Sequence, residues 1–332
     1  MSSIPRNAEN ENHVLDFVTN FIAEFHIGKL LFKGNAGKEK GILVMDIFRY
    51  LFCLLFSDRS MYRQRKTGVF KESFSQNTVY RFLNRTKTNG QRLTTLLSAK
   101  IMNDFMKPLT SDDRKDVLII DDSLFDRSRS QKTELLAKVF DHCSMKDKHG
   151  YRMLTLGWSD GNSFVPVNHC LLSAADDKNL LCKAECFDGR SLAGKRRSQS
   201  RRKATDVMVE LIQAAQKAGI TAKDVVFDRW FSSPKTIQAL KKEENLDVIA
   251  MGKRSSKITY GYPCKNLKIK EIYSRNKKRR GHFRYRLSVK VTVDEEQIPA
   301  KIVCVRNKSK RKDWLALIST DTSLSEEEII RL

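Results

Sequence analysis

The chain has 332 residues and is strongly basic, with 62 Lys and Arg against 39 Asp and Glu and a formal net charge of +23. A surplus of this size is expected of a protein that neutralises phosphates along a polyanion. The sequence contains no run of about 18 apolar residues and therefore predicts no membrane-spanning helix. Membrane-surface binding would also explain the charge, but no long basic amphipathic helix with an aromatic face stands out.

Length and cysteine usage indicate the class of protein. The chain is long enough for two domains, or for one domain with an insertion. Its seven cysteines are odd in number and include no C-x-x-C pair, which is typical of reduced thiols in a cytosolic protein. The polar segment 1–12 does not fit a secretory signal, so we expect a cytoplasmic, nucleoid-associated protein. The spacing of His142, Cys143 and His149 matches no common zinc module.

The first third of the chain is predicted to be helical. After a loose tail over 1–12, apolar residues at three- and four-residue steps predict one helix over 13–32. The apolar run 42–56 is too short and interrupted for a membrane span and predicts a deeply buried helix packed on the first. A further helix over 90–105 completes an all-helical region that ends near Pro108.

The segment 73–84 has the pattern of a short amphipathic helix. Val79, Phe82 and Leu83 fall on one face, after a polar cap. The other faces carry side chains typical of the DNA-reading helix of a helix-turn-helix, and an ordinary helix with a solvated face is the alternative. The candidate recognition residues are Gln76, Asn77 and Arg81.

Two short apolar runs end in carboxylates. The run 116–120 precedes Asp121 and Asp122, and the run 223–227 precedes Asp228. Each run predicts a buried strand, and acids at the carboxyl ends of strands lie where open α/β sheets place their sites. The alternative is that Asp121 and Asp122 only begin a turn. Carboxylates at a common edge repel each other, so this arrangement implies a bound Mg²⁺ or Mn²⁺.

The segments around these strands predict a mixed sheet flanked by helices. Strands over 151–159 and 163–172 flank Asp160-Gly161-Asn162, a strong hairpin signal. Further expected elements are a short helix or turn over 133–140, a loop over 141–150, helices over 206–218 and 236–242, and a strand over 246–251. After residue 252 short strands are expected over 268–273, 282–293, 298–306 and 314–319, and Ser325 with the three following glutamates opens a last helix.

These acids and their surroundings resemble the insertion-sequence DDE transposases, whose catalytic core is ribonuclease-H-like. The resemblance covers roughly residues 110–332 and includes the spacing between the two acids. The residues that carry it are Ile120-Asp121-Asp122-Ser123, Asp126-Arg127-Ser128-Arg129-Ser130, Gly157-Trp158-Ser159-Asp160-Gly161 and Phe227-Asp228-Arg229-Trp230-Phe231-Ser232-Ser233.

The resemblance implies a fold class and a division of the chain. The fold class is α/β, with a ribonuclease-H-like mixed sheet flanked by helices, an N-terminal all-helical region and a β-rich insertion. The expected divisions are a helical DNA-binding region over 1–110, the first part of the core over 111–251, the β-rich insertion over 252–315, and a return to the core over 316–332 with the final strand and the start of a helix.

The resemblance also implies an activity, metal-dependent cleavage and transfer of DNA strands. Asp121 and Asp228 would be the catalytic acids and the ligands of two Mg²⁺ or Mn²⁺ ions, with Asp122 as the fallback for the first. The expected partners are double-stranded DNA, as element ends and target, and a second copy of the chain in a homodimer on paired ends.

One feature of that family is missing from the sequence. The family's third acid is a Glu within a Tyr, Arg, Glu and Lys signature, and no such signature occurs before Leu332. We therefore expect a chain truncated before its third acid, with weak or absent cleavage. The glutamates at 326–328 are helix-start residues first, so we do not assign that role to them.

Three basic runs, over 190–203, 275–290 and 306–312, hold a large share of the positive charge. Three such runs are better explained as phosphate contacts than as solvated loops. Basic residues just after the first acid are candidates for holding the scissile phosphate, with salt bridges as the alternative. The candidate DNA-binding residues are Arg127, Arg129, Lys132, Lys195, Arg196, Arg197, Arg201, Arg202, Lys203, Arg229, Lys277, Lys278, Arg279 and Arg280.

Two other functions fit the same residues. A catalytically inactive DNA-binding remnant of a transposase would keep the basic surface and two acids. A metal-dependent ribonuclease-H-like nuclease that acts on RNA would use the same core and charge.

Overall fold

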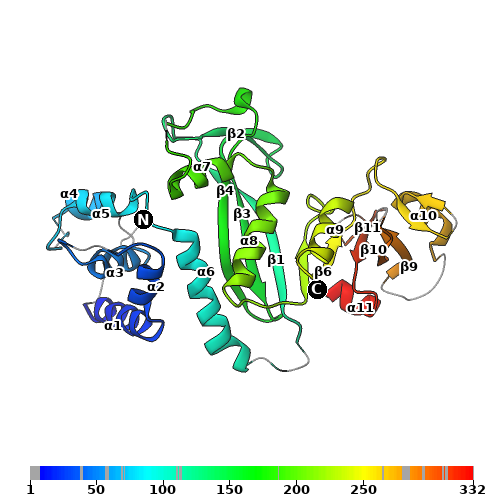
Figure 1. Cartoon of the computed structure of the whole chain (residues 1–332), viewed down its shortest axis with the longest axis horizontal. Coiled ribbons are helices and arrows are strands. Elements are labelled where there is room, and N and C mark those ends of the chain that lie inside the picture. Colours follow the sequence, from blue (N-terminus) through cyan, green and yellow to red (C-terminus); the bar gives the residue numbers. More distant parts are fainter. Residues whose placement is uncertain are drawn as a thin grey trace. The chain divides into compact units, whose positions relative to one another are not determined.

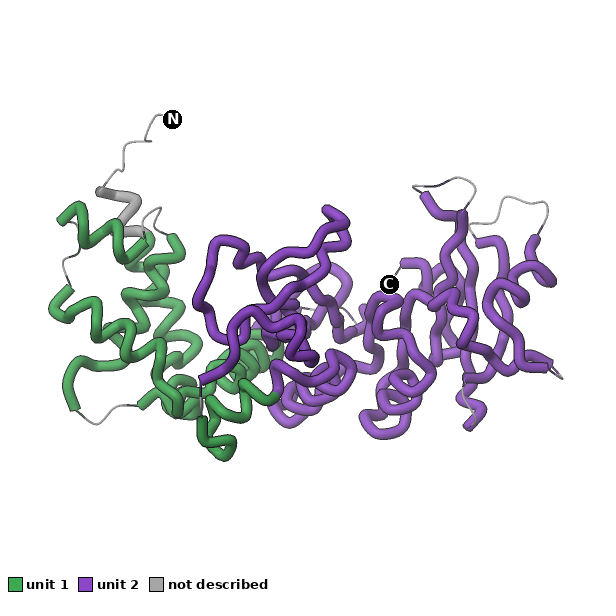
Figure 2. Tube along the Cα trace, turned by 90° about the horizontal axis from the view of Figure 1, so that it is seen from above, with its two compact units in different colours: residues 1–104, 186–198 green, residues 105–185, 199–332 purple. Residues whose placement is uncertain are grey.

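The chain forms two compact units in the computed structural model (Figure 2). Unit 1 consists of residues 1–104 and 186–198, and unit 2 consists of residues 105–185 and 199–332. The structure describes residues 8–37 (8–13 by backbone alone), 40–56, 60–68, 70, 72–109, 111, 114–185, 187–263, 265–278, 285–293, 296–308, 310 and 313–331.

Unit 1 is helical. Its helices are α1 (Ala8–Glu24), α2 (Ile27–Lys33), α3 (Val44–Leu54), α4 (Met61–Lys66), α5 (Gln76–Leu83), α6 (Gly90–Ile101) and most of α7 (Leu192–Ser200). Phe21 of α1 stacks on Phe52 of α3, with ring centroids 5.2 Å apart. The prediction that the second apolar segment packs on the first is therefore confirmed. A second apolar cluster joins Tyr50 of α3 to Val79 of α5.

The boundaries of the first helices differ from the prediction. Helix α1 begins at Ala8, inside the predicted tail, of which residues 1–7 lie outside the described part. The single helix expected over 13–32 is two helices, because His26 has a φ of 54°, in the left-handed region that ends a helix. Helix α3 is shorter than expected: Ile47 within it is buried, whereas Leu55, just beyond its end, is 74% exposed.

Unit 2 is built on a large mixed sheet (Figure 1). Its strands are β1 (Val117–Asp126), β2 (Ala137–Asp141), β3 (Lys146–Ser159), β4 (Phe164–Leu172), β5 (Asp224–Phe227), β6 (Asp247–Met251), β7 (Tyr260–Tyr262), β8 (Lys265–Leu267), β9 (Tyr285–Val293), β10 (Ile298–Arg306) and β11 (Trp314–Ser319). Its helices are α8 (Ala204–Lys217), α9 (Pro234–Lys242), α10 (Ile269–Asn276) and α11 (Glu326–Arg331). Shorter helices of other types are the π-helix η1 (Met102–Met106), which begins at the end of unit 1, and the 3-10 helices η2 (Lys107–Leu109) and η3 (Asp177–Asn179).

The strand order is β2-β3-β1-β5-β6-β11-β10-β9-β7-β8, and β4 also pairs with β3. Strands β1, β5 and β6 are parallel, whereas the other pairs are antiparallel. Strand β11 returns from the end of the chain to pair with β6, so the strands after residue 252 continue the same sheet. The predicted fold class, an α/β structure with a mixed sheet and flanking helices, is confirmed.

Several local predictions are confirmed. Strands β3 and β4 form the expected hairpin, in which Gly161 has a φ of 91° and Asp160 accepts hydrogen bonds from the backbone N–H groups of Asn162 and Ser163. Helices α8, α9 and α11 lie in the predicted segments, and β10 and β11 have the predicted bounds.

Three segments of unit 2 were predicted wrongly. The expected helix or turn over 133–140 contains β2, and the expected loop over 141–150 contains the start of β3, because these two strands pair with each other. The expected strand over 268–273 is the start of α10, in which Ile269 and Ile272, three residues apart, are both buried. Of the strand expected over 282–293, residues 282–284 lie outside the described part.

Helix α11 covers one face of the sheet between β6 and β10. Leu324 and Ile329 pack on Ile249 of β6 and Val303 of β10, with Val226 of β5 at the margin of this cluster. Helix α8 packs on β3 and β4 (Figure 1). No helix in the described residues is long and apolar enough to cross a membrane.

Candidate active site

The structure places Asp121 and Asp228 side by side. Strands β1 and β5 are parallel neighbours, and the last residue pair in their register is Ile120 with Phe227. Asp121 comes directly after Ile120, and Asp228 comes directly after Phe227, so the two acids project from the same face of the sheet. This is also the face that carries Val226, on which the α11 cluster packs. Strand β1 itself continues to Asp126 against β3, so the prediction that it ends at Asp121 is wrong.

The two carboxylates influence each other electrostatically. Asp121 is an exposed residue, but partial desolvation of its carboxylate, and then the negative charge of Asp228, raise its pKa. The backbone N–H of Arg229 donates a hydrogen bond of 2.6 Å to Asp228 Oδ1. Within the described residues, neither acid forms an ion pair with a basic side chain. Two adjacent carboxylates that lack basic partners are the oxygen donors that a hard divalent cation prefers.

Asp122 has a different environment. Successive residues of a strand point to opposite faces, so Asp122 projects away from the face of Asp121. Its carboxylate forms an ion pair with Arg152 of β3. Burial lowers the pKa of Arg152. Asp122 is thus separated from Asp228 and already has a basic partner.

A basic pocket of ≈ 590 Å³ lies beside Asp228, at the carboxyl ends of β5 and β6. Four of its lining residues are basic, namely Arg229, Lys253, Arg254 and Lys270. The guanidinium of Arg254 is held in place, because it donates a 2.8 Å hydrogen bond to Asp313 and lies 5.0 Å from the ring centroid of Trp314. The remaining basic side chains have no carboxylate partner among the ion pairs of the described residues. Such a pocket suits a phosphate next to the acids.

The family of the protein follows from a comparison with known protein families. The model of the DDE superfamily endonucleases matches residues 52–315, and this range contains both acids and the four basic residues of the pocket. The chain belongs to the DDE superfamily endonucleases. None of the curated proteins matches the chain. Membership of this family implies nuclease or transposase chemistry in general, DNA as the substrate, and the use of divalent metal ions.

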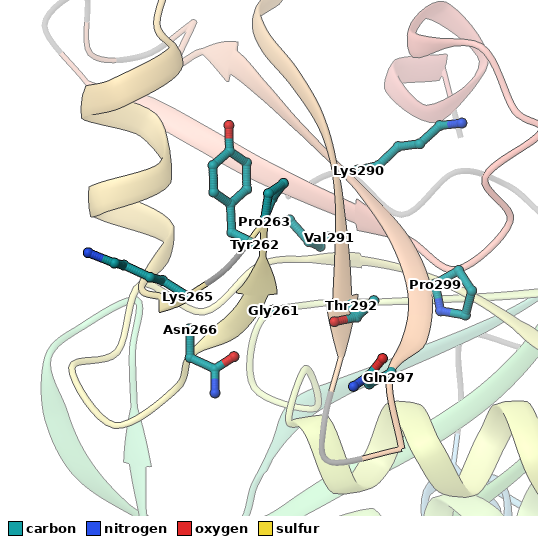
Figure 3. A pocket seen from close by; sticks show the side chains of 10 residues that line it. All are labelled: Gly261, Tyr262, Pro263, Lys265, Asn266, Lys290, Val291, Thr292, Gln297 and Pro299. Carbon is teal, nitrogen blue, oxygen red and sulfur yellow. The ribbon is translucent and has the colours of Figure 1, made fainter.

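A larger hollow of the DDE endonuclease lies away from the acids. It has a volume of ≈ 930 Å³, and it is lined by Gly261, Tyr262, Pro263, Lys265, Asn266, Lys290, Val291, Thr292, Gln297 and Pro299. Its lysines, Lys265 and Lys290, extend to opposite sides (Figure 3). Positive charge therefore does not converge in this hollow, and neither acid lines it. Size alone does not mark the functional pocket here.

Aromatic side chains are exposed next to Asp228. Trp230 is 51% exposed, and its ring packs on His142 at a centroid distance of 4.9 Å. Phe140 packs on the other side of this pair, 5.0 Å from His142. Lys253 of the basic pocket lies 5.8 Å from the Trp230 ring centroid. The group joins cationic and aromatic surface, a combination used to bind nucleic-acid strands.

The predicted phosphate-binding residues fall into two groups. Arg201 and Arg202 pair with Asp177 and Glu210, so their charges already have carboxylate partners. Within the described residues, no ion pair with a carboxylate is formed by Arg127, Arg129, Lys132, Lys195, Lys203, Arg229 and Lys277. Arg196 donates a hydrogen bond to Asn89, Arg197 lies over the Phe187 ring, and Lys278 lies over the Tyr285 ring. Arg279 and Arg280 lie outside the described residues.

The predicted recognition residues lie on α5. Asn77 and Arg81 are exposed, whereas the amide of Gln76 is bound to Arg65 at 2.9 Å and to Tyr80 at 3.0 Å. Val79 is buried as expected. The prediction that Leu83 belongs to the buried face is wrong, since its side chain is 56% exposed at the end of the helix.

Two of the three glutamates of α11, Glu326 and Glu328, have partners other than the two acids. Glu326 accepts a 2.6 Å hydrogen bond from Ser288, and Glu328 pairs with Lys115 at 2.8 Å. His142, Cys143 and His149 are not part of any metal-ligating group found among the described residues.

Prediction from sequence missed several residues around the site. These are Lys253, Arg254 and Lys270 of the basic pocket and the exposed ring of Trp230. The sequence held a signal for Lys253 and Arg254, because they come just after the end of β6 in the same way that Asp228 comes just after the end of β5. Three further acids, at the other end of the parallel strands, were also missed.

Proposed function

We propose that this protein is the DNA transposase of an insertion sequence, which binds the element ends and catalyses metal-dependent cleavage and transfer of DNA strands. The observation that carries the proposal is the pairing of Asp121 of β1 with Asp228 at the carboxyl end of β5, directly beside the basic pocket. Phosphoryl transfer requires catalytic acids and phosphate-binding residues close to each other, and this part of the sheet supplies both.

Asp121 and Asp228 would hold the divalent cations, Mg²⁺ or Mn²⁺, in a two-metal site. Bound there, the cations supply Lewis-acid assistance to in-line attack at phosphorus. The chain itself orients the reacting phosphate, because Arg229, Lys253 and Lys270 present positive charge next to the acids. Trp230 offers a ring on which a displaced base can stack. Asp122, the earlier alternative to Asp121, is disfavoured by its ion pair with Arg152.

The third acid expected for such an enzyme is not assigned to α11. Glu326 and Glu328 are already bound to Ser288 and Lys115, and both interactions hold their side chains in the folded structure. This supports the expectation that residues 316–332 are a return to the core and do not complete the acidic site.

Unit 1 would supply recognition of the element ends. Asn77 and Arg81 of α5 are exposed side chains of the type that reads base edges, and the region around 1–110 would be the DNA-binding part of the protein. A homodimer on paired ends fits the proposed reaction, since two ends must be cut and joined together. The strands over 252–315 would form the β-rich insertion.

The test is a cleavage assay on a duplex that carries the DNA flanking the coding region, with Mg²⁺ or Mn²⁺. Because no third acid is assigned, we expect only weak cleavage by the wild-type chain. Asp121→Asn and Asp228→Asn should each abolish it, since the cation site supplies several kcal/mol of transition-state stabilisation. Duplex binding should change little, because the basic residues remain. Asp122→Asn is the matched control and should keep cleavage.

Each other outcome has a definite meaning. Cleavage that survives in both variants would show that the active site lies elsewhere. A wild-type chain that binds the duplex but cuts it with neither metal would favour the inactive DNA-binding remnant. Cleavage of RNA in preference to the duplex would favour the ribonuclease alternative.

A further inference from the structure

A second group of acids lies at the opposite end of the parallel strands. Asp224 is the first residue of β5, Asp247 is the first residue of β6, and the two are paired in register. Asp321 follows β11, which pairs with β6. One carboxylate oxygen from each of the three acids lies within 4.8 Å of the others. Since Asp228 follows the other end of β5, this group is distinct from the proposed active site.

Two of the three carboxylates have basic partners. Lys241 Nζ lies 2.6 Å from Asp247 Oδ1, which also accepts a 2.7 Å hydrogen bond from the Thr320 hydroxyl. Lys223 Nζ lies 2.5 Å from Asp321 Oδ2. The Lys223 side chain is 62% exposed, so water competes for its charge. The group therefore contains three carboxylates and two ammonium groups, one of them largely solvated.

Asp224 is the carboxylate that lacks a partner. Its side chain is fully buried, and neither of its oxygens has a hydrogen-bond partner among the described residues. Burial raises its pKa to about 6, although the charge of Lys223 acts in the opposite direction. Buried polar atoms without partners are rare in folded proteins and call for a bound ion, a water molecule or a proton.

We propose that Asp224, Asp247 and Asp321 form a second, structural cation site that takes a hard divalent cation such as Ca²⁺ or Mg²⁺. All the donors are carboxylate oxygens, with the Thr320 hydroxyl close by, and such donors suit these cations. Three carboxylates against two lysines leave one negative charge to offset. A divalent cation more than offsets it, and it also gives both free oxygens of Asp224 a partner.

A cation bound at this site would link three strands that come from separate parts of the chain. Strands β5 and β6 begin at two of the ligands, and β11 ends next to the third. The cation would thus hold the amino end of the parallel strands, while their carboxyl end carries Asp121 and Asp228. This role needs no DNA and is independent of the proposed transposase activity.

The competing explanation is that Asp224 holds a proton and stays neutral. A substitution separates the two, because Asn resembles a neutral carboxylic acid in shape but is a much poorer ligand for a divalent cation. Under the competing explanation Asp224→Asn leaves the thermal stability nearly unchanged, whatever cation is present. Under the proposal its effect depends on the cation.

The experiment uses the full chain with Asp121→Asn and Asp228→Asn, so that the proposed catalytic site no longer binds a cation. Thermal denaturation is measured in EDTA, in millimolar CaCl₂ or MgCl₂, and in NaCl of equal ionic strength. We expect Tm to rise by several degrees with a divalent cation, by mass action, and not with NaCl. Adding Asp224→Asn should abolish the rise and should increase Tm in EDTA, because a buried charge without a partner is removed.

The matched control is Asp116→Asn in the same background. Asp116 lies one residue before β1 and pairs with Lys107 at 3.5 Å, outside the group of three acids, so the cation-dependent rise should persist. Metal analysis of the dialysed proteins gives a readout that does not depend on unfolding. One bound ion per chain should be found in the background protein and none after Asp224→Asn, or after Asp321→Asn if the first variant does not fold. No ion in the background protein, or a rise in Tm that survives both substitutions, would overturn the proposal.

Discussion

Strand β5 has an acid at each end, and the two acids belong to regions with opposite surroundings. At the carboxyl end Asp228 is half-buried and Asp121 is exposed, and both lie beside basic side chains that also reach the surface. At the amino end Asp224 and Asp247 are buried, and the neighbouring lysine of Asp247 contacts its carboxylate directly. Under the two proposals the same residue type would serve two purposes, and its exposure to solvent distinguishes them.

The difference has a physical reason. A carboxylate that takes part in phosphoryl transfer must be reached by a cation and by a polyanion, so its basic neighbours have to bind the substrate and not the acid. A carboxylate that stabilises the fold is instead enclosed, and it then needs an internal partner because an isolated buried charge is costly. We expect substitutions at the two ends to change different properties.

Stability provides the largest contrast. Asp247→Ala should lower the free energy of unfolding by about 2–4 kcal/mol, because it leaves the Lys241 ammonium and the Thr320 hydroxyl without their acceptor. Asp121→Ala should change it by less than about 0.5 kcal/mol, as is usual for an exposed residue without a partner. Chemical denaturation of unit 2, followed by the fluorescence of buried Trp158, measures both. An equal loss in the two variants would remove the distinction between the two ends.

DNA affinity provides the next contrast. Replacing Arg229, Lys253 and Lys270 with Ala should weaken binding by about 10- to 100-fold for all duplex sequences and flatten the salt dependence, since each lost phosphate contact removes close to one unit of slope. Arg201→Ala with Arg202→Ala is the control, and its effect should be smaller because Asp177 and Glu210 already neutralise these residues. If only the control substitutions changed the slope of binding affinity against salt concentration, the DNA would bind to another surface of the protein.

The same titration distinguishes positioning from recognition. Replacing Asn77 and Arg81 of α5 with Ala should weaken binding to the element ends more than binding to random duplex, because base contacts carry sequence information and phosphate contacts do not. Gln76→Ala should have less effect, since its amide is already bound to Arg65 and Tyr80. Equal losses on both duplexes would return α5 to the role of an ordinary amphipathic helix.

Sequence patterns predicted the parts of the fold that local chemistry determines. The turn between β3 and β4 needs a residue with positive φ and an Asp that accepts nearby backbone N–H groups, and Gly161 and Asp160 supply them. The apolar runs before Asp121 and Asp228 predicted two parallel strands, and the pairing of those strands is what places the acids next to each other. The two candidate acids could be predicted because each directly follows a buried apolar run, although β1 itself continues to Asp126.

The segments predicted wrongly depend on pairing between distant residues. Strand β2 alternates buried and exposed residues over only five positions, and the start of β3 is polar. The two segments are joined by their pairing, in which Lys148 contacts Asp141 at 2.8 Å. Helix α10 was taken for a strand although its buried residues, Ile269 and Ile272, have helical spacing. The acids at the amino end of the strands were missed because an Asp before an apolar run has the pattern of a turn residue until the strands are paired.

The smallest expected effect concerns Glu328 of α11. Its ion pair with Lys115, just before β1, places it at the amino end of the parallel strands. The ion-pair hydrogen bond from Lys115, followed by hydrogen bonds from the backbone and hydroxyl of Ser325, lowers the pKa of Glu328 to about 2. A lowered pKa in the folded state means that the carboxylate stabilises the protein above pH 4.5, its ordinary value, and that this stability is lost as the pH falls toward 2. Glu328→Gln should therefore lower Tm on the order of 1 °C at pH 7, as expected for a surface pair.

The difference in Tm between the wild type and Glu328→Gln should narrow as the pH falls below 4.5, because protonation removes the same charge from the wild-type residue. Glu327→Gln is the matched control, since this neighbouring glutamate is exposed and makes none of these contacts, and its Tm should follow the wild type at every pH. If Glu328→Gln left Tm unchanged but abolished DNA cleavage, Glu328 would act with Asp121 and Asp228. In that case α11 would supply the third acid, and the assignment of this helix to the structural end of the sheet would be wrong.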